Sequence, residues 1–247
     1  MDNNLKRDYN LMFLGLFLAL GMIISMWILS GAILKLSPQN NTIEVKGMAE
    51  KSITSDFGTW TGSFTVDCQK LTDGYTMIQQ QKEKVLNYLE NKGIKREDIQ
   101  ISSLTTNVQY QMNENGIQTN NKLGYQLEQR VSIASNDINL ITKIANESTE
   151  LIQEGIEFMS FTPNYYYTKL NELKIEMLGE ATKDATKRAQ VLAENSGGKV
   201  GSVASAYQGI FQITPANSTE ISDYGMNDDV SIQKSIKAVV TLKFFID

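Results

Sequence analysis

An uninterrupted apolar segment near the N-terminus constrains this chain more than any other feature. Residues Leu11–Leu34 (LMFLGLFLALGMIISMWILSGAIL) contain no charged side chain. A helix rises about 1.5 Å per residue, so these 24 positions cross a hydrocarbon layer of about 30 Å with some tilt. A segment that is apolar on every face is rarely the core helix of a globular protein. The sequence therefore predicts a transmembrane anchor over residues 11–34 whose partner is the lipid bilayer.

A cleaved signal peptide is the alternative interpretation of the same segment. The apolar region of a signal peptide normally has about 7 to 15 residues and ends at a small-residue site of the A-x-A type. The run here is longer, and Ser30-Gly31-Ala32 inside it is a poor match to such a site. We therefore favour an uncleaved anchor.

Basic residues around the segment indicate its orientation. Lys6 and Arg7 precede it, whereas only Lys35 follows it closely. Because cytoplasmic flanks of membrane spans carry an excess of Lys and Arg, the N-terminus is expected in the cytoplasm of a single-pass protein of the cytoplasmic (inner) membrane. This orientation predicts a cytoplasmic tail (residues 1–10), the anchor (11–34), a polar linker (35–41) and an exported domain (42–247) that is periplasmic or extracellular.

The composition excludes several chemistries. The chain has no histidine, which rules out Ser-His-Asp and Cys-His catalysis and histidine-ligated zinc. Its 23 Lys and Arg against 28 Asp and Glu give a net charge of −5. This charge argues against a nucleic-acid partner, because binding to phosphates requires a basic surface. We identify no catalytic, cofactor-binding or metal-binding residue and expect no cofactor.

Hydrophobic periodicity predicts both strands and helices after the linker. Gly47 is expected to end or bend the first strand, Asn115-Gly116 to form a hairpin turn and Asn136 to cap the second helix. Gly93, Gly155 and Gly197-Gly198 are expected to end the three helices. Strands are predicted over residues 42–46, 55–66, 99–112, 125–133, 156–161, 199–207 and 232–246, and helices over residues 71–89, 138–152 and 170–195.

Residues 208–231 follow no pattern that we can place and are predicted to form a loop. A loop this long is uncommon in a compact domain and is usually functional, partner-binding or mobile. The order of the other elements predicts an α+β fold, with long helices packed on one side of a mostly antiparallel sheet and one N-terminal transmembrane helix before it. One large domain and two smaller ones both fit the length of the exported part.

Four short segments recur in an order and spacing typical of one family. They are Ile43–Glu50, Leu89–Ile101, Gly124-Tyr125, and the alanine-rich helix from Ala181 to Gly198 followed by Val200–Val203. On these segments the chain resembles the SIMPL-domain family (DUF541), whose members include bacterial envelope proteins linked to oxidative stress defence. The resemblance implies an exported α+β domain that forms large ring-like or channel-like homo-oligomers, and it implies no settled catalytic activity.

Three short patterns could carry chemistry but are better explained structurally. Ser231 and Lys234 fit the S-x-x-K pattern of Ser-Lys hydrolases, yet they run into a strand where that mechanism needs a helix start. Gly197–Gly201 faintly resembles a phosphate loop and is better explained as a helix cap. Glu220, Asp223 and Asp228-Asp229 have no ligand spacing of a calcium loop, which favours a solvated acidic loop.

Two features suggest contacts instead of catalysis. Tyr165, Tyr166 and Tyr167 form a possible interface, because tyrosine is enriched at protein interfaces and alternation along a strand turns part of the run outward. Cys68 is the only cysteine and cannot form an internal disulfide. We expect it to be buried as a small apolar side chain.

Taken together, these features favour a non-enzymatic, membrane-anchored envelope protein that forms a large homo-oligomer and acts in envelope integrity or stress defence. A periplasmic binding module that uses residues 208–231 to hold an unknown envelope partner is the alternative. A histidine-free Ser-Lys hydrolase is a third, weaker hypothesis.

Overall fold

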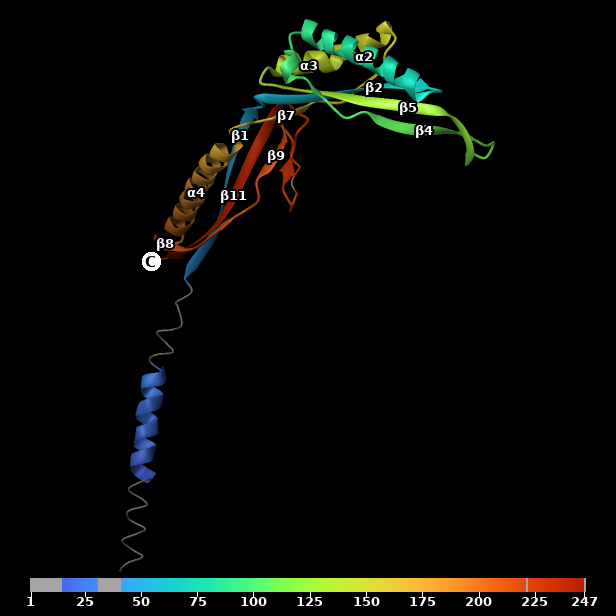
Figure 1. Cartoon of the computed structure of the whole chain (residues 1–247). Coiled ribbons are helices and arrows are strands. Elements are labelled where there is room, and N and C mark those ends of the chain that lie inside the picture. Colours follow the sequence, from blue (N-terminus) through green and yellow to red (C-terminus); the bar gives the residue numbers. More distant parts are fainter. Residues whose placement is uncertain (1–14, 31–40, 221, 247) are drawn as a thin grey trace, which may run out of the picture. The chain divides into compact units, whose positions relative to one another are not determined.

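Two mostly antiparallel sheets and the helices packed on them form the fold (Figure 1). The structure is a computed structural model that describes residues 15–30, 41–220 and 222–246. The α+β class is confirmed, but the single sheet predicted from the sequence is wrong. The chain divides into two compact units: residues 46–186 with 207–241, and residues 187–206 with the chain up to Val45 and from Leu242 on.

The larger sheet has six strands and lies wholly in the first of these units. Its central pair is long and antiparallel, with Trp60 opposite Ile133 and Phe64 opposite Gln129. The strands are β2 (Phe57–Cys68), β3 (Gln100–Ile101), β4 (Thr105–Met112), β5 (Gln118–Ser135), β6 (Glu157–Ser160) and β7 (Asn164–Tyr166). They are ordered β3-β5-β2-β6, with β4 also paired to β5 and β7 to β2.

Helices α2 (Leu71–Asn91) and α3 (Ile138–Glu147) cover one face of this sheet, as predicted (Figure 1). A core of apolar side chains lies between the helices and the sheet. Alternate residues of each strand and the apolar face of each helix point into this core. Its largest fully buried members include Trp60, Phe64, Ile78, Leu89, Leu127, Ile141, Ile144 and Leu151.

The second sheet has five strands: β1 (Thr42–Thr54), β8 (Val200–Gln208), β9 (Gln212–Pro215), β10 (Met226–Asn227) and β11 (Gln233–Ile246). The path is β1-β11-β9-β10, with β8 also paired to β11. Helix α4 (Leu170–Asn195) runs over the predicted residues.

The sequence predicted that Gly47 ends or bends the first strand, but the strand does not end there. β1 continues through it to Thr54. A side chain at this position would collide with the carbonyl oxygen of Ala181 and the backbone nitrogen of Ala185 in α4. The glycine therefore permits a close approach of helix and strand, at which the small side chains of Ala181 and Ala185 lie.

Several local predictions are corrected in detail. Asp137, not Asn136, caps α3, with its Oδ1 accepting from the Leu140 amide at 3.0 Å. The helix ends at Glu147, and a 3-10 helix (Ser148–Glu154) leads to Gly155. The strand predicted over residues 99–112 is interrupted between β3 and β4.

The apolar stripes of two helices do not extend to their ends. Leu71 and Tyr75 in α2 are exposed, while Ile78, Val85 and Leu89 are buried. In α4 the buried series passes through Ala193 instead of Leu192, which is exposed. The first turn of α2 and the last turn of α4 thus direct apolar side chains to solvent.

Candidate functional site

A two-stranded ribbon extends from the six-stranded sheet (Figure 1). β2 pairs with β5 as far as Cys68 opposite Tyr125, but β4 and β5 remain paired up to Met112 opposite Gln118. We call residues 109–124 the hairpin arm. The turn at its tip agrees with the prediction, since Gly116 has φ +73° and the Asn113 side chain accepts from the Ile117 amide at 2.9 Å.

The hairpin arm exposes several apolar side chains to solvent although it has only two strands. Tyr110 is 36% exposed, Met112 60% and Val108 41%, and the three lie close together along β4, whose register with β5 shifts on both sides of Tyr110. Ile117 and Leu123 are also exposed. An isolated two-stranded hairpin is marginally stable in water, and apolar side chains exposed together mark an association surface. The arm is therefore a candidate interface.

The outer edge of the hairpin arm lacks two of the devices that edge strands use to prevent association. β4 (TTNVQYQM) has neither charge nor proline, although its register with β5 shifts on both sides of Tyr110. In the described part of the chain, no third strand pairs with β4 on that side. Its free amides and carbonyls are open to a further strand.

Residues 208–231 are not the unstructured loop that the sequence predicted. They contain β9, antiparallel to β11, and β10, parallel to β9. The Gln212 side chain donates to the Ser222 carbonyl oxygen at 2.6 Å, and the Asp228 amide donates to the Ile213 carbonyl oxygen at 3.0 Å. The segment is thus tied to the sheet at several points.

A buried ion pair fixes the end of this segment. Lys234 is 2% exposed, and its Nζ donates to the Asp228 carbonyl oxygen at 2.6 Å and lies 3.7 Å from the Asp228 carboxylate. Burial lowers the pKa of Lys234, although the charges of Asp228 and Asp229 oppose this. Burial also raises the pKa of Asp228, but hydrogen bonds from Ser231 and Val230 outweigh it and the net pKa is lowered.

The S-x-x-K pair does not form a nucleophile and base. The Ser231 amide donates to Asp228 Oδ1 at 3.1 Å, and the lysine amine donates to the backbone of the same aspartate. Both residues therefore serve the Asp228 turn. The lowered pKa of Lys234 arises from its burial in the sheet.

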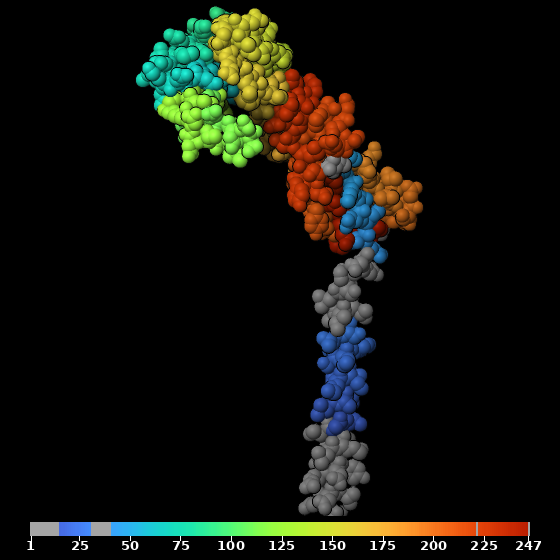
Figure 2. Space-filling view, turned by 90° about the vertical axis from the view of Figure 1, so that its right-hand side faces the viewer, coloured from blue at the N-terminus to red at the C-terminus, as the bar shows by residue number. Residues whose placement is uncertain are grey.

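A recess of about 720 Å³ opens beside this segment. Figure 2 shows the orange-red residues that follow β8 on the visible surface. The recess is bordered by the start of α4, at Leu170 and Lys174, and by both limbs of the segment, at residues 208–213 and 224–227. Sequence reasoning marked the segment as functional but missed Lys174, which no local pattern connects to it.

A second recess, of about 510 Å³, lies on the six-stranded sheet. Glu128, Arg130, Glu157 and Phe161 line it, with Arg130 Nε donating to Glu128 at 3.0 Å. By alternation these residues face away from the core residues Leu127 and Val131 that α2 and α3 cover.

The three consecutive tyrosines occupy different environments. Tyr165 is 5% exposed, and its hydroxyl lies 2.7 Å from that of Thr142. Tyr166 is 39% exposed and packs its ring against Phe57 at a centroid distance of 6.5 Å. Tyr167 is half-buried. Of the three, Tyr166 offers the most surface to a partner.

Cys68 and the acidic residues form no evident chemical centre. The Cys68 side chain is half-buried, less than the sequence predicted, and its sulfur fills the space above Gly74. Among the described residues, no three Cys, Asp or Glu side chains are grouped so as to hold a metal ion.

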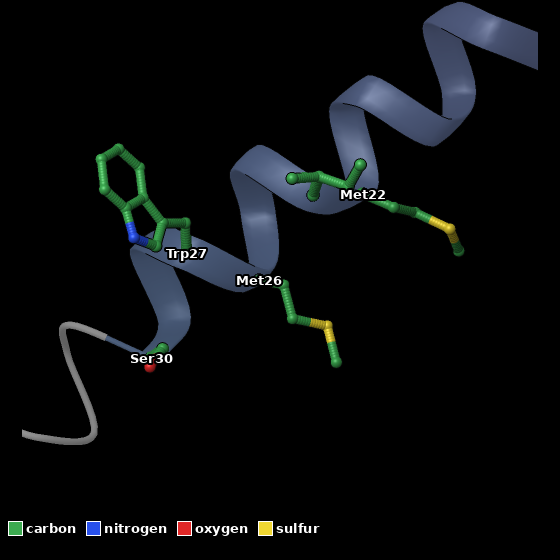
Figure 3. A pocket seen from close by; sticks show the side chains of 5 residues that line it. Met22, Met26, Trp27 and Ser30 are labelled. Carbon is green, nitrogen blue, oxygen red and sulfur yellow. The ribbon is translucent and has the colours of Figure 1, made fainter.

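The N-terminal apolar segment is described over residues 15–30, which are helical and exposed. Figure 3 shows Met22, Met26, Trp27 and Ser30 on this helix, and with Ile23 they line a recess formed by its side chains alone. Residues 11–14 and 31–34 of the predicted span lie outside the described part. Within that part, no helix has the length and apolar character needed to cross a membrane, so the anchor stays a prediction.

Comparison with known families gives one result. A family model described as SIMPL, a protein of unknown function (DUF541), matches residues 43–244. No curated protein matches the chain. The match covers most of the chain and includes both sheets, the hairpin arm and residues 208–231.

Proposed function

The chain belongs to the SIMPL family, and on that premise we propose that it is a membrane-anchored, extracytoplasmic protein that self-assembles without catalysing a reaction. Residues 11–34 hold it in the bilayer, and the exported domain serves envelope integrity or stress defence as a homo-oligomer. The family's function is unknown, so the proposal rests on this chain's own surfaces.

The hairpin arm is the observation that carries the proposal. Its edge strand is uncharged, with Tyr110 and Met112 exposed on it, and Ile117 in the turn and Leu123 on β5 are exposed as well. A second copy of the chain supplies both an apolar face and a strand edge of matching character, so two arms can bury each other's side chains and pair their free backbones.

Substitution of the arm tests the proposal. Tyr110→Ser combined with Met112→Ser removes two apolar contacts, and we expect it to weaken association by at least about tenfold, because each buried side chain of this size contributes about 1.5–3 kcal/mol. Association is measured on residues 37–247 by size-exclusion chromatography with light scattering across protein concentrations.

Asn107→Ser is the matched control, since Asn107 is also exposed on β4 but is polar and lies before the hairpin arm, where the pairing with β5 is regular. It should leave the oligomer unchanged. Equal masses for the control and the double variant at every concentration would exclude the arm as the interface.

A second candidate function is a binding module, favoured by the recess of about 720 Å³ beside residues 208–231. Deletion of the whole segment cannot test it, because β9 and the Asp228–Lys234 pair belong to the sheet. Point changes at Ile210 and Tyr224, which are 53% and 96% exposed, avoid that damage. If Ile210→Ser with Tyr224→Ser leaves capture of an envelope partner intact, the segment is not the binding surface.

A further inference from the structure

The recess beside residues 208–231 combines one positive charge with aromatic and aliphatic walls. Lys174 lies in the second turn of α4, and its Nζ is 5.6 Å from the centroid of the Phe211 ring. Ile210, Phe211 and Tyr224 supply apolar surface, while Gln208 and Asn227 supply amides. Binding sites for small molecules typically have this character, with apolar walls and a few polar groups that fix orientation.

The walls of the recess are held in place by backbone contacts. Gly225 has φ +85°, and a side chain there would meet Ile210 Cγ2 at 2.6 Å, so the two limbs of the segment touch at this point. On the other limb, the Gly209 amide donates to the Val239 carbonyl oxygen at 2.8 Å. The backbone of both limbs is therefore fixed before a ligand binds, which limits the entropic cost of binding, whereas the Tyr224 side chain is 96% exposed and is ordered by the ligand.

The charge of the recess is positive. Of the described residues that line it, Lys174 alone carries a formal charge. The Asp228 carboxylate does not line the recess: its Oδ1 accepts from the amides of Val230 and Ser231, and its Oδ2 lies 3.7 Å from the Lys234 amine. Lys174 itself forms no salt bridge in the described part of the chain, so its charge is available to a ligand.

We propose that this recess binds a small aromatic monoanion, with its ring between Phe211 and Tyr224 and its acidic group at Lys174. The volume of about 720 Å³ is within the range of sites for drug-sized ligands. The Tyr224 side chain is 96% exposed, so a ligand ring stacked on it would remove a large apolar surface from water. The inference rests on the second candidate function and names its ligand class.

Calorimetric titration of the full chain in lipid nanodiscs tests the charge and the ring separately. The probes are 1-naphthoate, the neutral 1-naphthylmethanol and the cationic 1-naphthylmethylammonium, with empty nanodiscs as reference. We expect naphthoate to bind about tenfold more tightly than the alcohol, and the cation most weakly, because a charged hydrogen bond contributes about 1.5–3 kcal/mol.

Two variants and a control locate the site. Lys174→Gln should remove the preference for naphthoate over the alcohol, and Tyr224→Ser should weaken both probes alike. Lys183→Gln is the matched control, because Lys183 lies on the same helix and pairs with Glu180 at 2.8 Å, away from the recess.

Equal binding of naphthoate and the alcohol by the unaltered chain would overturn the proposal, and so would equal naphthoate affinity in the Lys174→Gln and Lys183→Gln variants. Because the first comparison uses the unaltered chain, it decides the matter even if a variant fails to fold. Absence of naphthoate binding together with partner capture that depends on Tyr224 would reject the ligand class and leave the second candidate function standing.

Discussion

At the scale of single residues, Lys234 is the most unusual position. It follows the same alternation as Ile236, Ala238 and Val240, so period two places it on the buried face of β11. The alternation that buries Lys234 could be predicted from the sequence. Its contact with Asp228 could not, because the Asp228 turn depends on the pairing of β9 and β10, which no local pattern indicates. A buried amine is tolerated here because the Asp228 carbonyl and carboxylate both face it.

Removing the charge of Lys234 should destabilise the domain. We expect Lys234→Met to lower the free energy of unfolding by about 2–4 kcal/mol, because it leaves the Asp228 carboxylate without its partner. Lys183→Met removes an exposed i,i+3 pair and should cost less than about 0.5 kcal/mol. Urea unfolding of the two variants measures the difference, and equal losses would contradict the role given to the buried pair.

Asp228 should also make stability depend on acid. Its pKa in the folded chain is lowered from 3.8, so the stability from its ionised form is present above that value and is lost as pH falls through the folded pKa. The lowered pKa of Lys234 acts only at alkaline pH, where unfolding becomes harder as pH rises toward 10.5. Asp228→Asn should therefore show a smaller loss of unfolding free energy between about pH 5 and pH 2 than the unaltered chain. If the Asp228→Asn variant and the unaltered chain lose unfolding free energy equally as the pH falls, other carboxylates cause the loss.

At the scale of elements, the helices were predictable and the sheets only partly so. The bounds of α4 follow from periodicity and the end of α2 close to Gly93 follows from a glycine cap, both of which are local signals, whereas α3 ends at Glu147, before the predicted Gly155. The division into two sheets depends on which strands pair across long separations, and residue patterns do not encode this. Gly47 illustrates the limit: a strand glycine indicates a bend as readily as a close contact, and only α4 decides between them.

Two glycine substitutions test the contact between β1 and α4. Gly47→Ala should destabilise the domain by about 1–3 kcal/mol, because the added methyl meets the α4 backbone at Ala181 and Ala185. Gly179→Ala in the same helix adds a methyl to open space and should stabilise by about 0.5–1 kcal/mol. Thermal unfolding compares them, and a Gly47 variant as stable as the unaltered chain would show that α4 does not pack so closely.

At the scale of the whole molecule, the account depends on association. The turn of the hairpin arm was predictable from Asn115-Gly116, but the length of the ribbon beyond β2 was not, because it depends on where β2 ends. That unpartnered length, with its uncharged edge and exposed Tyr110 and Met112, is the main reason to propose a homo-oligomer. The proposed ligand recess is a separate surface, and its test does not require an assembly.

The molar mass of residues 37–247 in solution tests the central claim most directly. Light scattering during size-exclusion chromatography at micromolar concentration should give a molar mass at least twice that of one copy of residues 37–247. The Tyr110→Ser and Met112→Ser double substitution should reduce this mass, and Asn107→Ser should leave it unchanged. A monomer mass for the unaltered domain at every micromolar concentration would contradict the account.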